Sequence, residues 1–129
     1  MTHISRLKLS EKTSNQILNS FFYALTHIKN EKEMTAFLEA FLSNTEKMML
    51  AKRLAVVYLL KERVEDSKIS ETLNVTRETV ARLRLWSETK GSGYQVAIFK
   101  LREKKLLEEL KILALKAVRQ VIKGASGRF

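Results

Sequence analysis

Apolar side chains recur every three or four residues along most of the 129-residue chain, which is the spacing of one face of an α-helix. The stripes that define the predicted helices are Ile17–Ile28, Met34–Phe41, Met49–Leu60, Ile69–Leu73, Val80–Leu83 and Leu106–Val121. Proline is absent and only four glycines occur. Because both residues destabilise helix interiors, their scarcity leaves these stretches uninterrupted. The sequence therefore predicts an all-α fold.

Short polar segments separate the stripes at positions where helices commonly begin. Two of them have the spacing of a capping box, in which a polar side chain and a glutamate three residues later bond to each other's backbone amides. The expected capping residues are Asn30 with Glu33, Ser43 with Glu46, Asp66 or Ser67, and Thr76. The glycine-serine segment within residues 89–93 indicates a further break. We therefore expect a flexible N-terminus over residues 1–12, a helical domain over 13–90 and a long basic C-terminal helix over 94–123.

The charge of the chain favours a polyanionic partner. The formal net charge is +10, and residues 95–129 carry nine basic side chains against three acidic ones. An excess of this size is typical of nucleic-acid binding, although acidic proteins and anionic membranes also fit. The chain has no cysteine, which excludes disulfides and thiolate metal sites. It also has no apolar run of signal-peptide or membrane-spanning length, so a cytoplasmic location is expected.

Residues 67–86, SKISETLNVTRETVARLRLW, resemble a helix-turn-helix in their pattern. The shared apolar core would consist of Ile69, Leu73, Val75, Val80 and Leu83. Asn74 occupies the turn position that favours a positive φ, a conformation that asparagine tolerates. Thr76 would then cap the second helix, and Trp86 would pack where this helix joins the final one. A plain helical hairpin with a polar surface is the alternative interpretation.

If the second helix enters the major groove of DNA, its N-terminal turns contact the base edges. The residues expected to contact bases are Thr76, Arg77, Glu78, Thr79, Ala81 and Arg82. Other side chains are placed to contact the phosphates, which orient the protein without specifying sequence. The residues expected to contact phosphates are Lys68, Ser70, Arg84 and Lys90.

The run Phe41–Trp86 resembles the core of the Trp repressor superfamily. The resemblance lies in the opening at Leu42–Glu46, in AKRLAVVYLL at Ala51–Leu60 and in TVARLR at Thr79–Arg84. It implies an intertwined homodimer of all-helical chains that places two recognition helices in successive major grooves of double-stranded DNA. Residues 13–90 would then combine dimerisation with DNA binding, and repression of transcription is the expected outcome.

The resemblance also points to a candidate effector pocket. Arg53 and Arg82 match the two arginines that hold tryptophan in members of the superfamily that sense it. Leu83 and Trp86 stand where those members have a glycine and a serine, and their bulk is expected to fill the space that an indole needs. A small-molecule effector stays open, but tryptophan is not the effector we expect, and Arg53 and Arg82 are interpreted as surface or phosphate-facing residues.

The C-terminal helix extends beyond what the resemblance explains, and three interpretations stay open. Its apolar stripe of Leu106, Leu110, Leu113, Ala117 and Val121 fits a helix that packs on the core or on a second copy. Its basic side chains fit an arm that contacts phosphates flanking the DNA site. A helix that lies on a membrane surface is the third interpretation.

No catalytic constellation is present in the sequence. His3 and His27 have no partner at metal-ligand or triad spacing, and GSG at residues 91–93 lacks the flanking lysine and strand of a phosphate-binding loop. We therefore expect no enzymatic activity, no cofactor and no metal. The prediction is a sequence-specific, DNA-binding transcription regulator. The alternative is a non-enzymatic helical protein-interaction or assembly protein with a basic surface.

Overall fold

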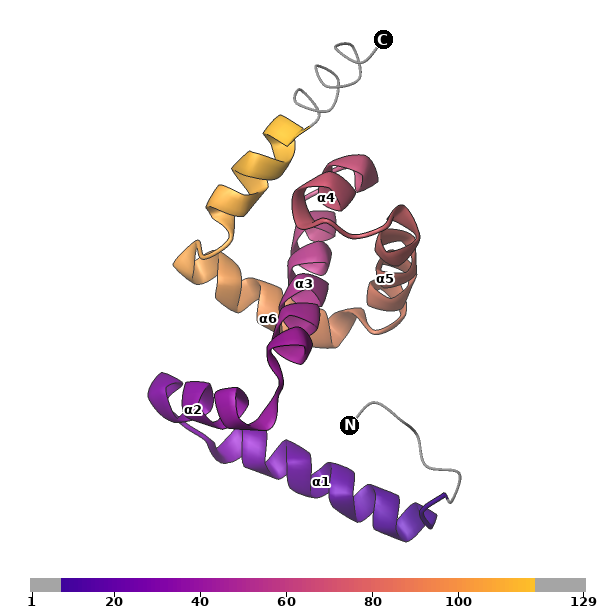
Figure 1. The fold of residues 1–129 in the computed structure, drawn as a ribbon, viewed down its shortest axis with the longest axis vertical. Helices are drawn as coiled ribbons and strands as arrows, with labels where there is room; N and C mark the ends of the chain where they lie inside the picture. Colours follow the sequence, from indigo (N-terminus) through magenta and orange to yellow (C-terminus); the bar gives the residue numbers. More distant parts are fainter. Residues whose placement is uncertain (1–7, 118–129) are drawn as a thin grey trace. The chain divides into compact units, whose positions relative to one another are not determined.

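The computed structural model describes residues 8–117, which are helical apart from short joints (Figure 1). The helices are α1 (Glu11–His27), α2 (Glu31–Phe41), α3 (Asn44–Lys61), α4 (Asp66–Leu73), α5 (Arg77–Thr89) and α6 (Gly91–Lys104). A further helical segment covers residues 108–117. The predicted all-α fold is confirmed. None of the described helices has the length and apolar character needed to cross a membrane.

The chain divides into two units, of which the first ends at Asn44 and contains α1 and α2. Helix α1 begins earlier than the sequence pattern indicated, because the Ser10 hydroxyl accepts a hydrogen bond from the Thr13 amide at 3.1 Å. Part of the segment expected to be flexible is therefore helical. Asn30 caps α2 as expected, since its Oδ1 accepts from the Glu33 amide at 2.7 Å. Glu33 Oε1 accepts from the Asn30 side-chain Nδ2 at 2.9 Å instead of from the Asn30 backbone amide.

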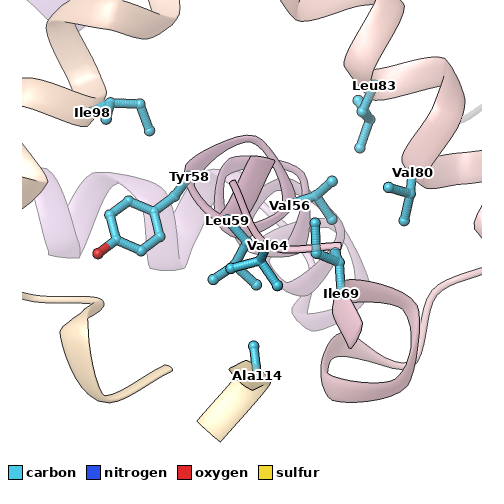
Figure 2. Packing of buried hydrophobic residues seen from close by; sticks show 9 residues of the cluster. All are labelled: Val56, Tyr58, Leu59, Val64, Ile69, Val80, Leu83, Ile98 and Ala114. Carbon is cyan, nitrogen blue, oxygen red and sulfur yellow. The ribbon is translucent and has the colours of Figure 1, made fainter. Parts of the chain in front are cut away.

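The second unit is built around α3, whose residues Ala55–Leu59 are all buried. Five consecutive buried residues cover every side of a helix, so α3 is surrounded by its neighbours along this stretch. Figure 2 shows α3 end-on, with side chains from other elements directed towards it. They are Ile69 from α4, Val80 and Leu83 from α5, Ile98 from α6 and Ala114 from the segment over residues 108–117.

Three helix ends in this unit adopt a positive φ without glycine. Arg63 follows α3 with φ 63°, and Asn74 and Lys105 follow α4 and α6, each with φ 53°. After α3 and α6 the next amide bonds back to the helix, from Val64 to the Leu59 carbonyl at 3.0 Å and from Leu106 to the Leu101 carbonyl at 3.2 Å. These bonds satisfy carbonyls that the helix end would leave unpaired. The chain therefore reverses direction at side-chain-bearing residues, at a cost in backbone strain.

The C-terminal region corrects the prediction of one long helix over residues 94–123. Helix α6 starts at Gly91 and ends at Lys104, and a turn over residues 105–107 precedes the last helical segment. The break returns the chain to α3, where Ala114 and Ala117 are buried and Leu110 packs against the core. Leu106 and Leu113 from the expected stripe are instead 66% and 53% exposed. Residues 118–123 of the prediction lie outside the described part of the chain.

Glu62, which directly follows α3, connects this C-terminal region to the core. It lies 3.3 Å from Arg102 Nε and 3.8 Å from Lys111 Nζ, so two basic residues of the predicted arm are paired within the molecule. The neighbouring Tyr58 is buried, and burial, followed by the charge of Glu62, raises the pKa of its hydroxyl above the ordinary value. Up to residue 117 the C-terminal region is therefore connected to the core by ion pairs and by the buried Ile98 and Ala114, while Leu106 and Leu113 stay exposed.

Candidate nucleic-acid interface

Helices α4 and α5 form the helix-turn-helix that the sequence pattern predicted. Ile69 and Val80 are fully buried and Leu83 is 8% exposed, while Leu73 and Val75 are half-buried against the same cluster. All five expected core residues thus lie together (Figure 2 shows Ile69, Val80 and Leu83). Because this cluster also includes α3 residues, α5 is fixed to the rest of the second unit by one of its faces.

The turn between the two helices is held by its own side chains. Asn74 has φ 53° and ψ 54°, the left-handed conformation expected for it. The Ser70 hydroxyl donates to the Val75 carbonyl at 2.5 Å, and the Thr76 hydroxyl accepts from the Thr79 amide at 3.1 Å. The predicted cap at Thr76 is therefore confirmed. The predicted cap of α4 at Asp66 or Ser67 is wrong, because α4 begins after Glu65 with no side-chain capping bond.

The outer face of α5 is open to solvent. Of the six residues expected to contact bases, all are exposed except Thr79, which is half-buried. The side chains of Arg77, Glu78 and Arg82 make no hydrogen bond or ion pair with any residue between 8 and 117. Leu85, on the same outer face, is 66% exposed. The charged groups of this face are thus free to bind a partner outside the chain.

The four residues expected to contact phosphates differ in their surroundings. Lys90 is exposed and Lys68 is half-buried, and neither side chain has a bonded partner in the described part of the chain. The Ser70 hydroxyl is used within the turn. Arg84 forms an ion pair with Asp66, in which Nη1 donates to Oδ2 at 3.0 Å and Nη2 to Oδ1. Two of the four are therefore available without rearrangement.

A cavity of about 420 Å³ lies between α3 and α5. Arg53 and Arg82, the two positions of the candidate effector pocket, both line it, together with Leu83 and Trp86. Leu83 and Trp86, the bulky side chains expected to take the space that an indole needs, both stand in its wall. Trp86 is also 53% exposed rather than packed at the joint with the final helix. The remaining lining residues are Met49, Lys52, Val56, Val75 and Thr79.

Two polar contacts of the helix-turn-helix were missed by sequence reasoning. Asp66 was interpreted as a helix cap, yet its carboxylate pairs with Arg84, 18 residues away. Lys52 Nζ donates to the Asn74 carbonyl at 3.5 Å, which links α3 to the turn. Neither contact has a local sequence signal, because each depends on how separate helices pack.

His27, the one histidine within residues 8–117, contacts its neighbours in α1. His27 Nδ1 lies 2.9 Å from the Tyr23 carbonyl, and its ring stacks on that of Tyr23 with centroids 3.8 Å apart. Among residues 8–117, no group of three histidine, aspartate or glutamate side chains is close enough to hold a metal ion. His3 lies outside the described residues.

Comparison with known proteins agrees with this geometry. A family model described as Trp repressor protein matches residues 16–102, which span α2 to α5, most of α1 and most of α6. No curated protein and no solved structure gives a significant match. The family is one of non-enzymatic, DNA-binding helix-turn-helix regulators. Since its model covers more than half of the chain, including the whole helix-turn-helix, this protein belongs to the Trp repressor family.

Proposed function

We propose that the protein is a sequence-specific regulator of transcription that binds double-stranded DNA as a homodimer and inserts α5 into the major groove. The observation that carries the proposal is the two-sided character of α5. Val80 and Leu83 hold one face in the core, while the opposite face exposes Arg77 and Arg82 without internal partners. A helix anchored in this way projects its polar side chains at fixed positions, as base recognition requires.

The exposed side chains have the chemistry of base recognition. The guanidinium groups of Arg77 and Arg82 match the two acceptors on a guanine edge, and the Glu78 carboxylate accepts from the cytosine amino group. Ala81 offers an apolar contact for a thymine methyl group. Each good bidentate contact discriminates against the wrong base by about 1–3 kcal/mol. Lys68 and Lys90 would add phosphate contacts that orient α5 without reading sequence.

The homodimer is inferred from the apolar surface of the first unit. Helices α1 and α2 have no buried residue, although Phe21 stacks on Phe41 with centroids 5.5 Å apart, and Phe37 stacks on Phe41 at 5.0 Å. Ile17, Leu18, Phe22 and Tyr23 are each at least half exposed. An apolar surface of this kind requires a partner in water. A second copy of the chain supplies one and places two α5 helices on one DNA molecule.

Repression is the direction of regulation that we propose. A dimer that occupies two successive major grooves excludes other proteins from the same stretch of DNA. The half-sites would be related by two-fold symmetry and separated by about one helical turn. Binding of this kind requires neither a cofactor nor catalytic activity.

Selection of bound duplexes from a random pool, followed by fluorescence anisotropy, tests the proposal. We expect the pool to converge on a palindromic site, and we expect the protein to retain this site against random duplex at about 0.15 M salt, where non-specific contacts are weak. Arg82→Ala should relax the preference at one position of each half-site. Lys100→Ala, which removes an equal charge from the exposed surface of α6, should not. A pool that fails to converge would favour the protein-interaction alternative.

A further inference from the structure

A bidentate ion pair between Arg84 and Asp66 joins the two helices of the helix-turn-helix. Arg84 Nη1 donates to Asp66 Oδ2 at 3.0 Å, and Nη2 donates to Oδ1. Arg84 lies in the second half of α5, and Asp66 lies in the first turn of α4. A guanidinium binds two oxygens of a phosphate in the same bidentate geometry. In the free protein the carboxylate therefore occupies the side of Arg84 that would face a phosphate.

The position of the pair makes this competition relevant to DNA. Arg84 immediately precedes Leu85, which lies on the exposed outer face of α5, and it follows Arg82 by two residues. The Arg84 side chain is 46% exposed and that of Asp66 is 31% exposed. A phosphate that approaches the flank of α5 can therefore reach the guanidinium from solvent.

The surroundings of Asp66 allow it to lose its partner. An ion pair with this much solvent exposure is weak, because water screens the attraction and two side chains must be held in one geometry. Asp66 also lies in the first turn of α4, where the free backbone amides of a helix start stabilise a negative charge. The carboxylate thus stays favourably placed after Arg84 has turned away.

We propose that Asp66 sets the DNA affinity of this protein by holding Arg84, and that Arg84 exchanges the carboxylate for a DNA phosphate when the complex forms. The inference rests on the proposed DNA binding. Asp66 itself contacts no DNA in this scheme, and it acts as a positioning residue through Arg84. Because phosphates are present at every sequence, the exchange changes affinity for specific and random duplex alike.

Four variants of the full chain test the exchange by fluorescence anisotropy on the selected site and on random duplex. They are Asp66→Asn, Arg84→Gln, the double variant, and Glu71→Gln as a control. The control removes the same charge from an exposed residue of α4 that has no bonded partner among the described residues. We expect Asp66→Asn to bind both duplexes about two- to fivefold more tightly than Glu71→Gln, which is the factor that an exposed ion pair can contribute.

The salt dependence identifies the contact that Arg84 makes. Arg84→Gln should reduce the slope of log affinity against log salt by about 0.9, the change expected for the loss of one phosphate contact. Adding Asp66→Asn to Arg84→Gln should then change affinity no more than Glu71→Gln does. Thermal unfolding of each variant shows whether a lower affinity comes from a less stable fold.

A purely structural pair gives the opposite results. In that case Asp66→Asn and Arg84→Gln both lower the melting temperature, Asp66→Asn binds no better than Glu71→Gln, and the salt slope of Arg84→Gln equals that of the unaltered chain. Either binding result, an unchanged affinity of Asp66→Asn relative to Glu71→Gln or an unchanged salt slope of Arg84→Gln, would overturn the exchange. Failure of the unaltered chain to bind any duplex would instead reject the proposed function, so the two failures are distinguishable.

Discussion

The orientation of α5 can be tested by truncating one side chain on each of its two faces. Val80→Ala shortens a side chain that is 0% exposed, whereas Leu85→Ala shortens a larger one that is 66% exposed. Both residues lie in the same helix and both become alanine, so the backbone and the new residue are matched. If the outer face of α5 is free, the smaller truncation must be the more destabilising one.

The expected magnitudes follow from burial. Val80→Ala removes two methyl groups from the core, at about 0.8 kcal/mol each for transfer from water. The unfilled cavity adds to this loss, while the better helix propensity of alanine returns about 0.5 kcal/mol. The net loss should be about 2 kcal/mol of unfolding free energy. Leu85→Ala should stay within about 0.5 kcal/mol, as is usual for exposed positions.

Urea unfolding followed by far-ultraviolet circular dichroism measures both variants, with the protein concentration held constant because the proposed dimer would unfold in a concentration-dependent way. With a slope of about 2 kcal/mol per molar urea, Val80→Ala should lower the midpoint by roughly 1 M, and Leu85→Ala by no more than a quarter of that. If Leu85→Ala proved as destabilising as Val80→Ala, the outer face of α5 would be buried, and the DNA-binding interpretation would fail.

Three further predictions concern other parts of the molecule. Lys105→Gly should stabilise the protein by about 0.5–1 kcal/mol. Glycine relieves the backbone strain of φ 53°, and the greater flexibility that it gives the unfolded chain offsets part of this gain. A lower urea midpoint than that of the unaltered chain would argue against strain at this turn. The raised pKa of Tyr58 means that its hydroxyl keeps its proton more readily in the folded state than in the unfolded state. The contribution of Tyr58 to the free energy of unfolding is therefore complete below about pH 10 and is lost as pH rises further. Tyr58→Phe should reduce the loss of stability at high pH, as measured by urea unfolding across that range. Isothermal titration with tryptophan should give no saturable binding at micromolar concentration, because the bulky Leu83 and Trp86 line the cavity beside Arg53 and Arg82.

The helix-turn-helix was predictable because its signals are local. Asn74 tolerates the left-handed turn, Thr76 caps the helix that follows it, and Ile69 and Val80 have the spacing of a shared core. Each of these features depends on a few neighbouring residues, so the sequence contains them directly. The start of α2 after the Asn30 cap was predictable for the same reason.

The features that were missed depend on packing between distant segments. The turn at Lys105 has no glycine or proline to mark it, and it forms because the chain beyond it buries Ala114 and Ala117 against the core. Tertiary burial of this kind overrides local helix propensity. The pairing of Asp66 with Arg84 likewise requires α4 and α5 to be docked. A periodic pattern predicts that a helix exists, but the helix's neighbours decide where it ends and which face is covered.

The arrangement of α5 separates residues that can vary freely from residues that cannot. The side chains of Arg77, Glu78 and Ala81 are exposed and have no partner among the described residues, so substitutions there should cost little stability. Arg82 borders the cavity between α3 and α5, and Arg84 is held by Asp66. Substitutions at these two positions would therefore alter the surroundings of α5 as well as the DNA contacts proposed for it. If the proposed DNA binding holds, substitutions at Arg77, Glu78 and Ala81 should alter base preference with the least effect on stability, whereas substitutions at Arg84 should also break the contact with Asp66.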